Sequence, residues 1–423
     1  RRSGTRERAP RGGIGLVCPG LWRAPPPPER ATEPPPRGMA DRAKAVRGRD
    51  EAEEDGGAPP AKAVREANPA AWLLEKDRLA VQEFPDGLRP LGPGEARVRV
   101  RAVGICGSDV HYLKHMELGP FRVEAPMVIG HESAGEVVEV HAEGCGDLAV
   151  GDRVAVEPGI PCRNCNLCLT GSYNLCETLT FHATPPMHGS LTRYIKHPAS
   201  FLFRLPPELS IEEGAMCEPL SVGLHACRRA SITAGTRVFV LGAGPIGMVT
   251  TQSALAFGAR AVVVADISQE RLDLLKSFWP DKAFTTLHTA GLSPSDVAAQ
   301  VAALLGGRRP DVTFDCCGVE ATARTALEAT TTGGSVCMIG CGGNEMKLPM
   351  VSAATREVDV LGIFRYKNTY ELAITLMANR TIDLRPMITH RFSLEDDFSA
   401  TTVNEGFEVS SRGGAAVKVM YRI

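Results

Sequence analysis

The chain has 423 residues, of which 43% are hydrophobic and 23% are charged, so it is long enough for two or three domains with buried cores. It carries 47 Lys and Arg against 49 Asp and Glu, and this near-neutral balance provides no overall field that would attract nucleic acid or an anionic membrane. A fibre and a coiled coil are excluded, and the expected partner is a small molecule.

Residues 1–66 consist mainly of Arg, Pro, Ala, Gly and Glu with almost no aliphatic periodicity, which predicts a disordered N-terminal extension. An organelle transit peptide is the lesser alternative, because the Glu and Pro residues oppose the amphipathic helix that such a peptide forms. We find no stretch apolar enough for a transmembrane helix or a secretory signal. We therefore expect a cytoplasmic protein, in which reduced thiols favour metal binding over disulfides.

The rest of the chain changes its pattern twice. Residues 67–220 alternate like β-strands between Gly and Pro turns, which predicts a mostly β domain with strands at Ala96–Val103, Gly135–Val140 and Arg153–Glu157. Residues 221–362 alternate apolar strands with helical stretches, which predicts a parallel α/β sheet with strands at Arg237–Leu241, Val262–Asp266, Val312–Asp315 and Ser335–Ile339 and helices at Arg271–Phe278 and Ala298–Leu305. Residues 363–423 hold a helix at Glu371–Ala378 and a strand at Lys418–Tyr421, and they are expected to return to the β domain.

A glycine-rich turn lies between an apolar strand and a helical stretch. Gly242, Gly244 and Gly247 form the GxGxxG pattern, which lets the backbone turn tightly and approach a pyrophosphate at a helix N-terminus. Asp266 ends the next strand, where an acid hydrogen-bonds the ribose and repels a 2′-phosphate, so NAD is preferred over NADP. Arg271 weakens that preference, since it could reach a phosphate. The alternative is a turn that only closes a βα unit.

Four cysteines lie in a Pro- and Asn-rich lobe at residues 160–178, as Cys162, Cys165, Cys168 and Cys176. Four thiolates at this spacing can close a tetrahedron around a structural zinc and leave no open position for a substrate. Two disulfides and an iron–sulfur cluster are the alternatives.

A second possible metal site is spread along the chain, with Cys106, His131, Glu132 and Glu218. One thiolate, one imidazole and carboxylates form the mixed ligand set of a catalytic zinc with an open position. Taken singly, each of these residues is more often a packing or capping residue. Beside a dinucleotide fold, together they indicate a site.

These motifs resemble the zinc-dependent medium-chain dehydrogenase family. The stretches GICGSDVHY (104–112) and GHE (130–132), the four-cysteine lobe and GAGPIG (242–247) occur in that family's order, and the resemblance extends over about Ala71–Lys418. VAVEPG, FHATPP, EPLSVGLHACRR and REVDVLGIFRY are similar to its polyol branch, the sorbitol dehydrogenases. The resemblance implies an α/β fold in which a GroES-like, mostly β catalytic domain is split around a Rossmann dinucleotide-binding domain.

The resemblance also implies roles for individual residues. Cys106, His131 and Glu132 would bind the catalytic zinc, with Glu218 bound directly or through water and the adjacent Cys217 as a competing ligand. The polyol site would be lined by Tyr112, Phe181, Thr184, Glu218, Arg365 and Tyr366. NAD would contact the three glycines and Ile246, Asp266, Arg271, Ile339, Gly340, Cys341, Ile363, Phe364 and Arg365.

The expected reaction is oxidation of a polyol to a ketose, with hydride transfer to NAD and one catalytic and one structural zinc per chain. Ser108 and His111, which follow Cys106 closely, are candidates for a proton relay. The resemblance implies a homotetramer. Another zinc-dependent alcohol dehydrogenase, a zinc-ribbon binding module and an NADH-binding scaffold without turnover are alternatives, and sorbitol, xylitol and arabinitol remain open as substrates.

Overall fold

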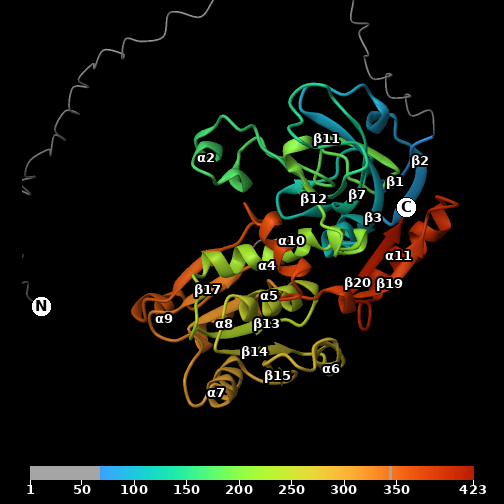
Figure 1. Cartoon of the computed structure of the whole chain (residues 1–423). Coiled ribbons are helices and arrows are strands. Elements are labelled where there is room, and N and C mark those ends of the chain that lie inside the picture. Colours follow the sequence, from blue (N-terminus) through green and yellow to red (C-terminus); the bar gives the residue numbers. More distant parts are fainter. Residues whose placement is uncertain (1–66, 343–344) are drawn as a thin grey trace, which may run out of the picture. The chain divides into compact units, whose positions relative to one another are not determined.

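The structure is a computed structural model that describes residues 67–342 and 345–423 (Figure 1). The extension predicted at 1–66 lies outside the described residues. In the described part, no helix combines the length and the apolar character that crossing a membrane requires.

The first domain is built on a seven-stranded sheet in which most neighbours are antiparallel. Six strands follow in the order β12 (Leu202–Arg204), β8 (Arg153–Val156), β7 (Glu132–Val140), β3 (Glu95–Gly104), β20 (Lys418–Arg422) and β19 (Ile388–Ser393), and β11 (Tyr194–Pro198) also pairs with β3. A smaller sheet has the order β2 (Arg78–Glu83), β1 (Pro69–Glu75) and β6 (Met127–Val128). Two-stranded pairs join β4 (Glu117–Leu118) to β5 (Phe121–Arg122) and β9 (Gly159–Ile160) to β10 (Thr180–Phe181).

The second domain has a six-stranded parallel sheet with the order β15 (Thr285–His288), β14 (Ala261–Asp266), β13 (Arg237–Leu241), β16 (Val312–Asp315), β17 (Ser335–Met338) and β18 (Asp359–Gly362). Counted along the chain this order is 3-2-1-4-5-6, which is that of the Rossmann fold. Its helices are α5 (Pro245–Ala256), α6 (Gln269–Phe278), α7 (Pro294–Leu304), α8 (Glu320–Ala329) and α9 (Met350–Thr355). The predicted fold is confirmed.

The central strands β13, β14 and β16 are mostly apolar and buried because both faces of the sheet are covered there. Val238 and Val240 belong to a core with α5 and with α4 (Cys217–Arg229), whereas Phe239 and Leu241 pack with α7 and α8 (Figure 1). The continuous apolar runs in the sequence therefore reflect burial on two sides. Strand β13 ends at the carboxyl edge of the sheet, so the glycine-rich turn that follows it lies at this edge.

The chain returns to the first domain in its last described segment. After α10 (Tyr370–Ala378), β20 pairs with β3, with Met420 opposite Gly104, and α11 (Ala400–Arg412) packs near it. The predicted boundary between residues 220 and 221 falls inside α4. This helix packs on α5 of the second domain, and it also contacts β7 of the first domain. The shorter helices are α1 (Gly107–His115), α2 (Asn166–Leu169) and α3 (Ile211–Ala215).

Candidate active site

The predicted catalytic ligands come from separate elements that meet between the two domains. Cys106 precedes α1, while His131 and Glu132 lie at the start of β7. The thiol sulfur, a ring nitrogen and a carboxylate oxygen of these three residues all lie within 4.8 Å of one another. Zinc ligands at about 2.0–2.3 Å from the metal have comparable separations, so this donor set fits zinc.

Asp109 supports this group from the first turn of α1. Its carboxylate accepts hydrogen bonds from the backbone N–H groups of Cys106 (3.0 Å) and Gly130 (3.2 Å), and it lies 3.4 Å from His131 Nδ1. Burial opposes charge on His131, yet Asp109 and Cys106 together raise the pKa of its ring well above the usual range. The group thus concentrates negative charge that a cation would balance. The sequence prediction missed Asp109, although its position three residues after Cys106 is that of a capping-box acid.

Lys418 is the second residue that the sequence prediction missed. Its Nζ donates to both oxygens of Glu132, at 2.7 and 2.6 Å, and to the carbonyl of Ile105 at 3.1 Å. Both charged side chains are almost completely buried, so each depends on the other for its charge. Lys418 and Glu132 are 286 residues apart, and no local pattern in the sequence connects them.

Glu218 reaches the same space from the first turn of α4. Tyr366 Oη donates to Glu218 Oε1 at 3.0 Å, and burial raises the pKa of Glu218 to about 7 although His131 opposes the shift. Cys217 is completely buried, and its sulfur lies 3.9 Å from the carbonyl of Glu213. Of the two competing ligands, Glu218 is therefore the one that faces the site.

A cavity of about 470 Å³ opens above these ligands, which is the size of a small-molecule site. The Arg365 guanidinium stacks 3.7 Å from the ring centre of Phe181 and donates to Thr184 Oγ1 at 3.0 Å. Burial raises the pKa of Tyr112 to about 12, so its hydroxyl stays protonated. The predicted site residues that line this cavity are Cys106, Ser108, Tyr112, His131, Phe181, Thr184, Glu218, Ile246, Ile339, Cys341, Ile363, Phe364 and Arg365.

Three predicted residues of this site, Glu132, Tyr366 and His111, do not line the cavity. Tyr366 is buried behind it and reaches the cavity through its bond to Glu218. His111 is exposed on α1, with Nδ1 2.7 Å from the carbonyl of Glu117, so only Ser108 of the two relay candidates borders the cavity.

The glycine-rich turn has the geometry that its pattern predicts. Gly242 has φ of +100°, and a Cβ on Gly247 would lie 1.7 Å from the carbonyl oxygen of Gly242, so neither position tolerates a side chain. The Asp266 carboxylate accepts from the backbone N–H groups of Ala243 (2.7 Å) and Ser268 (2.8 Å), which fixes it beside the turn.

The remaining predicted cofactor residues lie on neighbouring loops. A Cβ on Gly340 would lie 2.3 Å from the backbone nitrogen of Gly318, so this loop passes close to the one after β16. Arg271 is half-buried in the first turn of α6, where the Ser268 side chain accepts from its backbone N–H.

The four-cysteine lobe projects from the first domain around α2 (Figure 1). The four sulfurs lie within 4.8 Å of one another, with Cys168 at 3.4 Å from Cys165 and 3.9 Å from Cys162. A tetrahedron of zinc–sulfur bonds requires sulfurs about 3.8 Å apart, so this set also fits zinc. The lobe cysteines are free thiols, and backbone N–H groups of Asn164 and Cys165 lower the pKa of Cys162 to about 6, which favours a thiolate.

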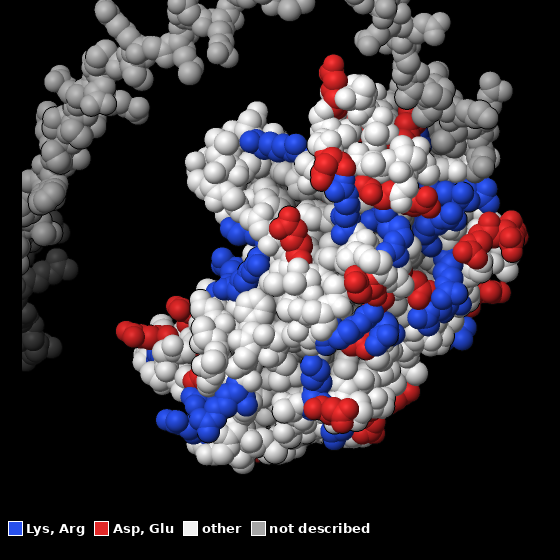
Figure 2. Space-filling model, in the orientation of Figure 1, with Lys and Arg blue, Asp and Glu red and all other residues white. Residues whose placement is uncertain are grey.

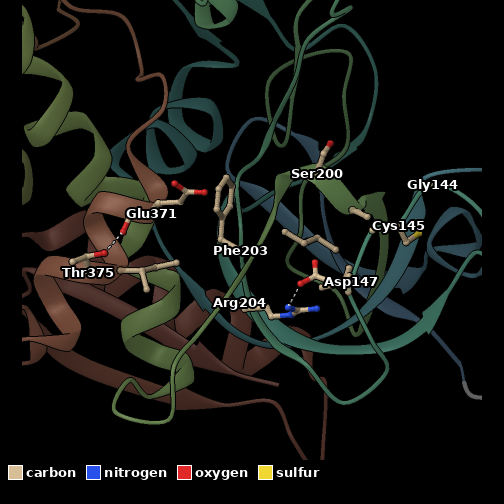
Figure 3. A pocket seen from close by; sticks show the side chains of 13 residues that line it. Gly144, Cys145, Asp147, Ser200, Phe203, Arg204, Glu371 and Thr375 are labelled. Carbon is tan, nitrogen blue, oxygen red and sulfur yellow. Dashed lines mark hydrogen bonds and ion pairs between the residues drawn. The ribbon is translucent and has the colours of Figure 1, made fainter. Parts of the chain in front are cut away.

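A larger cleft of about 630 Å³ lies elsewhere, between the loop before β8 and helix α10 (Figure 3). Arg204 in this cleft binds Asp147 at 2.7 Å, and Thr375 Oγ1 donates to the backbone carbonyl of Glu371 at 2.8 Å. None of the residues in the two metal-ligand groups lines this cleft. On the face drawn in Figure 2, basic and acidic side chains are interspersed, unlike the basic patch of a nucleic-acid-binding module.

Comparison with known proteins gives consistent matches along the chain. The family model described as "Alcohol dehydrogenase GroES-like domain" matches residues 92–207, and that described as "Zinc-binding dehydrogenase" matches residues 245–379. Sorbitol dehydrogenase of Arabidopsis thaliana is 50% identical over 363 residues, which cover 85% of this chain and 96% of that protein. L-idonate 5-dehydrogenase of Vitis vinifera is 47% identical over 358 residues, covering 85% and 95%. The solved structure of L-idonate 5-dehydrogenase from Escherichia coli matches with a TM-score of 0.75 at 27% identity, covering 85% of this chain and 99% of that one.

Proposed function

Because the chain belongs to the zinc-binding dehydrogenase family, we propose that it oxidises a polyol to a ketose with NAD as the hydride acceptor. The relatives that it matches over most of their length include a sorbitol and an L-idonate dehydrogenase. The observation that carries the proposal is the cavity in which Cys106 and His131 meet Arg365, Thr184 and Glu218, while Glu132 completes the ligand group beside them. An apolar alcohol cannot form hydrogen bonds with these polar groups beyond its single hydroxyl, whereas a polyol can hydrogen-bond several of them.

The residues divide the work as follows. Cys106, His131 and Glu132 would hold the catalytic zinc, with Glu218 opposite them, and this ion supplies Lewis acidity while NAD supplies hydride-accepting capacity. Arg365 and Tyr112 orient the substrate by donating hydrogen bonds to its hydroxyl oxygens.

Ser108, which borders the cavity, would pass a proton outward, and His111, exposed on the same helix, would accept it. The lobe cysteines Cys162, Cys165, Cys168 and Cys176 would hold the structural zinc.

We further infer a homotetramer in the cytoplasm. The described cysteines are free thiols, which fits a reducing compartment. Val351 and Met350 on α9 and Val360 on the edge strand β18 are exposed apolar residues, which supports contact between subunits on that side of the Rossmann domain.

The test is the rate of NAD reduction with sorbitol, xylitol, arabinitol and ethanol at equal concentrations. We expect at least one polyol to exceed ethanol about tenfold in kcat/KM, and Arg365→Ala to remove most of that advantage while changing ethanol turnover little. Glu371→Ala, in the cleft of Figure 3, is the matched control and should behave as wild type. Preference for ethanol over every polyol would favour a simple alcohol dehydrogenase and contradict the proposal.

A further inference from the structure

The segment 364–368, which carries Arg365 and Tyr366, has a strained backbone. It connects β18 to α10, and both Arg365 and Asn368 have φ of +52° without being glycine. Such conformations are unfavourable for residues with a Cβ and persist where the surroundings fix them. The segment therefore needs partners beyond its own chain neighbours.

Those partners are consecutive residues at the end of the four-cysteine lobe. Asn174 Nδ2 donates to the carbonyl oxygen of Phe364 at 2.9 Å, in the peptide unit just before Arg365. Tyr173 Oη accepts from the backbone N–H of Asn368 at 2.8 Å. The two bonds thus act at the two strained positions, although they join residues that lie 190 and 195 positions apart in the sequence.

Tyr173 is in turn fixed by Glu157. Its hydroxyl donates to Glu157 Oε1 at 2.7 Å, and Glu157 is 1% exposed. Glu157 Oε2 and Asn174 Oδ1 are buried and have no hydrogen-bond partner among the described residues, and both residues line a cavity of about 10 Å³ together with Tyr366 and Arg365. That volume accommodates one water molecule, which would satisfy the two acceptors.

We propose that Tyr173, Asn174 and Glu157 are positioning residues for polyol recognition, which hold the segment 364–368 so that Arg365 and Tyr366 face the substrate. The lobe then has a second task besides binding metal. This inference rests on the proposed function for its kinetic part, because Arg365 and Tyr366 matter only if the substrate carries several hydroxyls.

The experiment compares Tyr173→Phe and Asn174→Ala with Leu169→Ala, a control on the exposed part of the same lobe. Loss of either hydrogen bond should raise the polyol KM about tenfold with kcat within about twofold, whereas Leu169→Ala should match wild type. Zinc content should stay at the wild-type value in all three variants. Glu157→Ala should resemble Tyr173→Phe, and Glu157→Gln, which keeps an acceptor, should restore the wild-type KM.

Hydrogen–deuterium exchange of the peptide 361–370 measures how firmly the backbone of the segment is held, and it requires no turnover. We expect exchange several times faster in Tyr173→Phe and Asn174→Ala than in wild type. Unchanged exchange, or faster exchange with an unchanged polyol KM, would overturn the inference. If the wild type oxidises no polyol, the proposed function fails, and the exchange rates still decide whether the lobe holds the segment.

Discussion

The buried carboxylates of this protein differ in the groups that form hydrogen bonds or ion pairs with them. Glu132 is matched by the ammonium group of Lys418, and Asp266 accepts from two backbone N–H groups. Glu157 accepts from the hydroxyl of Tyr173 with one oxygen, and its other oxygen has no partner in the part of the chain that the structure describes. Glu132 and Asp266 thus have donors for their carboxylate oxygens, whereas Glu157 has much less compensation for the cost of burying its charge.

Asp266→Ala should relax the cofactor preference toward NADP, because it removes the carboxylate that would accept ribose hydroxyls and repel a 2′-phosphate. We expect the ratio of kcat/KM for NAD to that for NADP to fall about tenfold or more. Asp273→Ala, which removes an exposed charge from the same region, is the control. An unchanged ratio in Asp266→Ala would mean that this carboxylate does not contact the ribose.

Glu157 should make the free energy of unfolding depend on pH. Burial raises its pKa from the usual 4.5 to about 7, although Tyr173 opposes the shift, and the charge of Glu218 adds to it. The folded protein therefore binds this proton more tightly than the unfolded chain does. The contribution of Glu157 to the free energy of unfolding is fully present below about pH 4.5 and is lost as the pH rises through 7.

The stability lost at pH 8 is roughly 3.5 kcal/mol at most, because each tenfold difference in proton affinity between the folded and unfolded chain corresponds to about 1.4 kcal/mol. Glu157→Gln cannot ionise, so we expect its stability to decline less than that of wild type between pH 5 and pH 8 in urea unfolding. Parallel curves for the two proteins would show that Glu157 does not titrate in this range.

At the scale of elements, predictions succeeded where the signal is local. Strands β13 and β16 have the predicted bounds, because their apolar runs are buried on both faces and end at glycine- or cysteine-rich turns. The helix α11 and the strand β19 were not predicted, since their charged and polar residues mask the periodicity of the few apolar ones. Contacts such as Lys418 to Glu132 or Tyr173 to Asn368 join polar residues whose sequence neighbourhoods carry no sign of each other.

The two metal-ligand groups should respond differently to mutation, because their supporting elements differ. Cys106→Ser should abolish turnover and remove about one zinc per chain. The thermal midpoint should change little, because α1 and β7 do not depend on the catalytic zinc for their packing. Cys165→Ser should lower the thermal midpoint, because the two helical turns of the lobe have only four and three residues and the lobe depends on the metal for its fold.

Metal content, thermal midpoint and polyol turnover measured on the same samples distinguish these effects. Cys145→Ser, a free cysteine outside both groups, is the control and should retain both zincs. Two zincs and wild-type stability in Cys165→Ser would rule out the structural assignment, and residual polyol oxidation by Cys106→Ser would rule out the catalytic one.

At the scale of the whole chain, the first domain is closed by strand β20. This strand lies between β3 and β19, so it is internal to the seven-stranded sheet although it follows every other described strand in the sequence. Val419, Met420 and Tyr421 are almost fully buried there. The sequence predicted this return to the first domain, but not its central place in the sheet.

A chain that ends at Val417 should therefore lose the first domain, because β3 and β19 would no longer be joined. We expect little soluble protein, and rapid proteolysis of residues 67–216 in whatever remains. Arg422→Ala, which removes only the exposed ion pair with Glu212, is the full-length control and should resist proteolysis like wild type. Equal resistance of the truncated chain would contradict this prediction.

The position of Lys418 also has a consequence for synthesis on the ribosome. Glu132 is translated 286 residues before its buried counter-ion, which lies in β20. When every predicted zinc ligand has been translated, the nascent chain still lacks the ammonium group of Lys418 that balances the charge of Glu132. Products terminated before Lys418 are thereby left with an incomplete centre, and the enzyme gains its full site only after β20 has left the exit tunnel and joined the sheet.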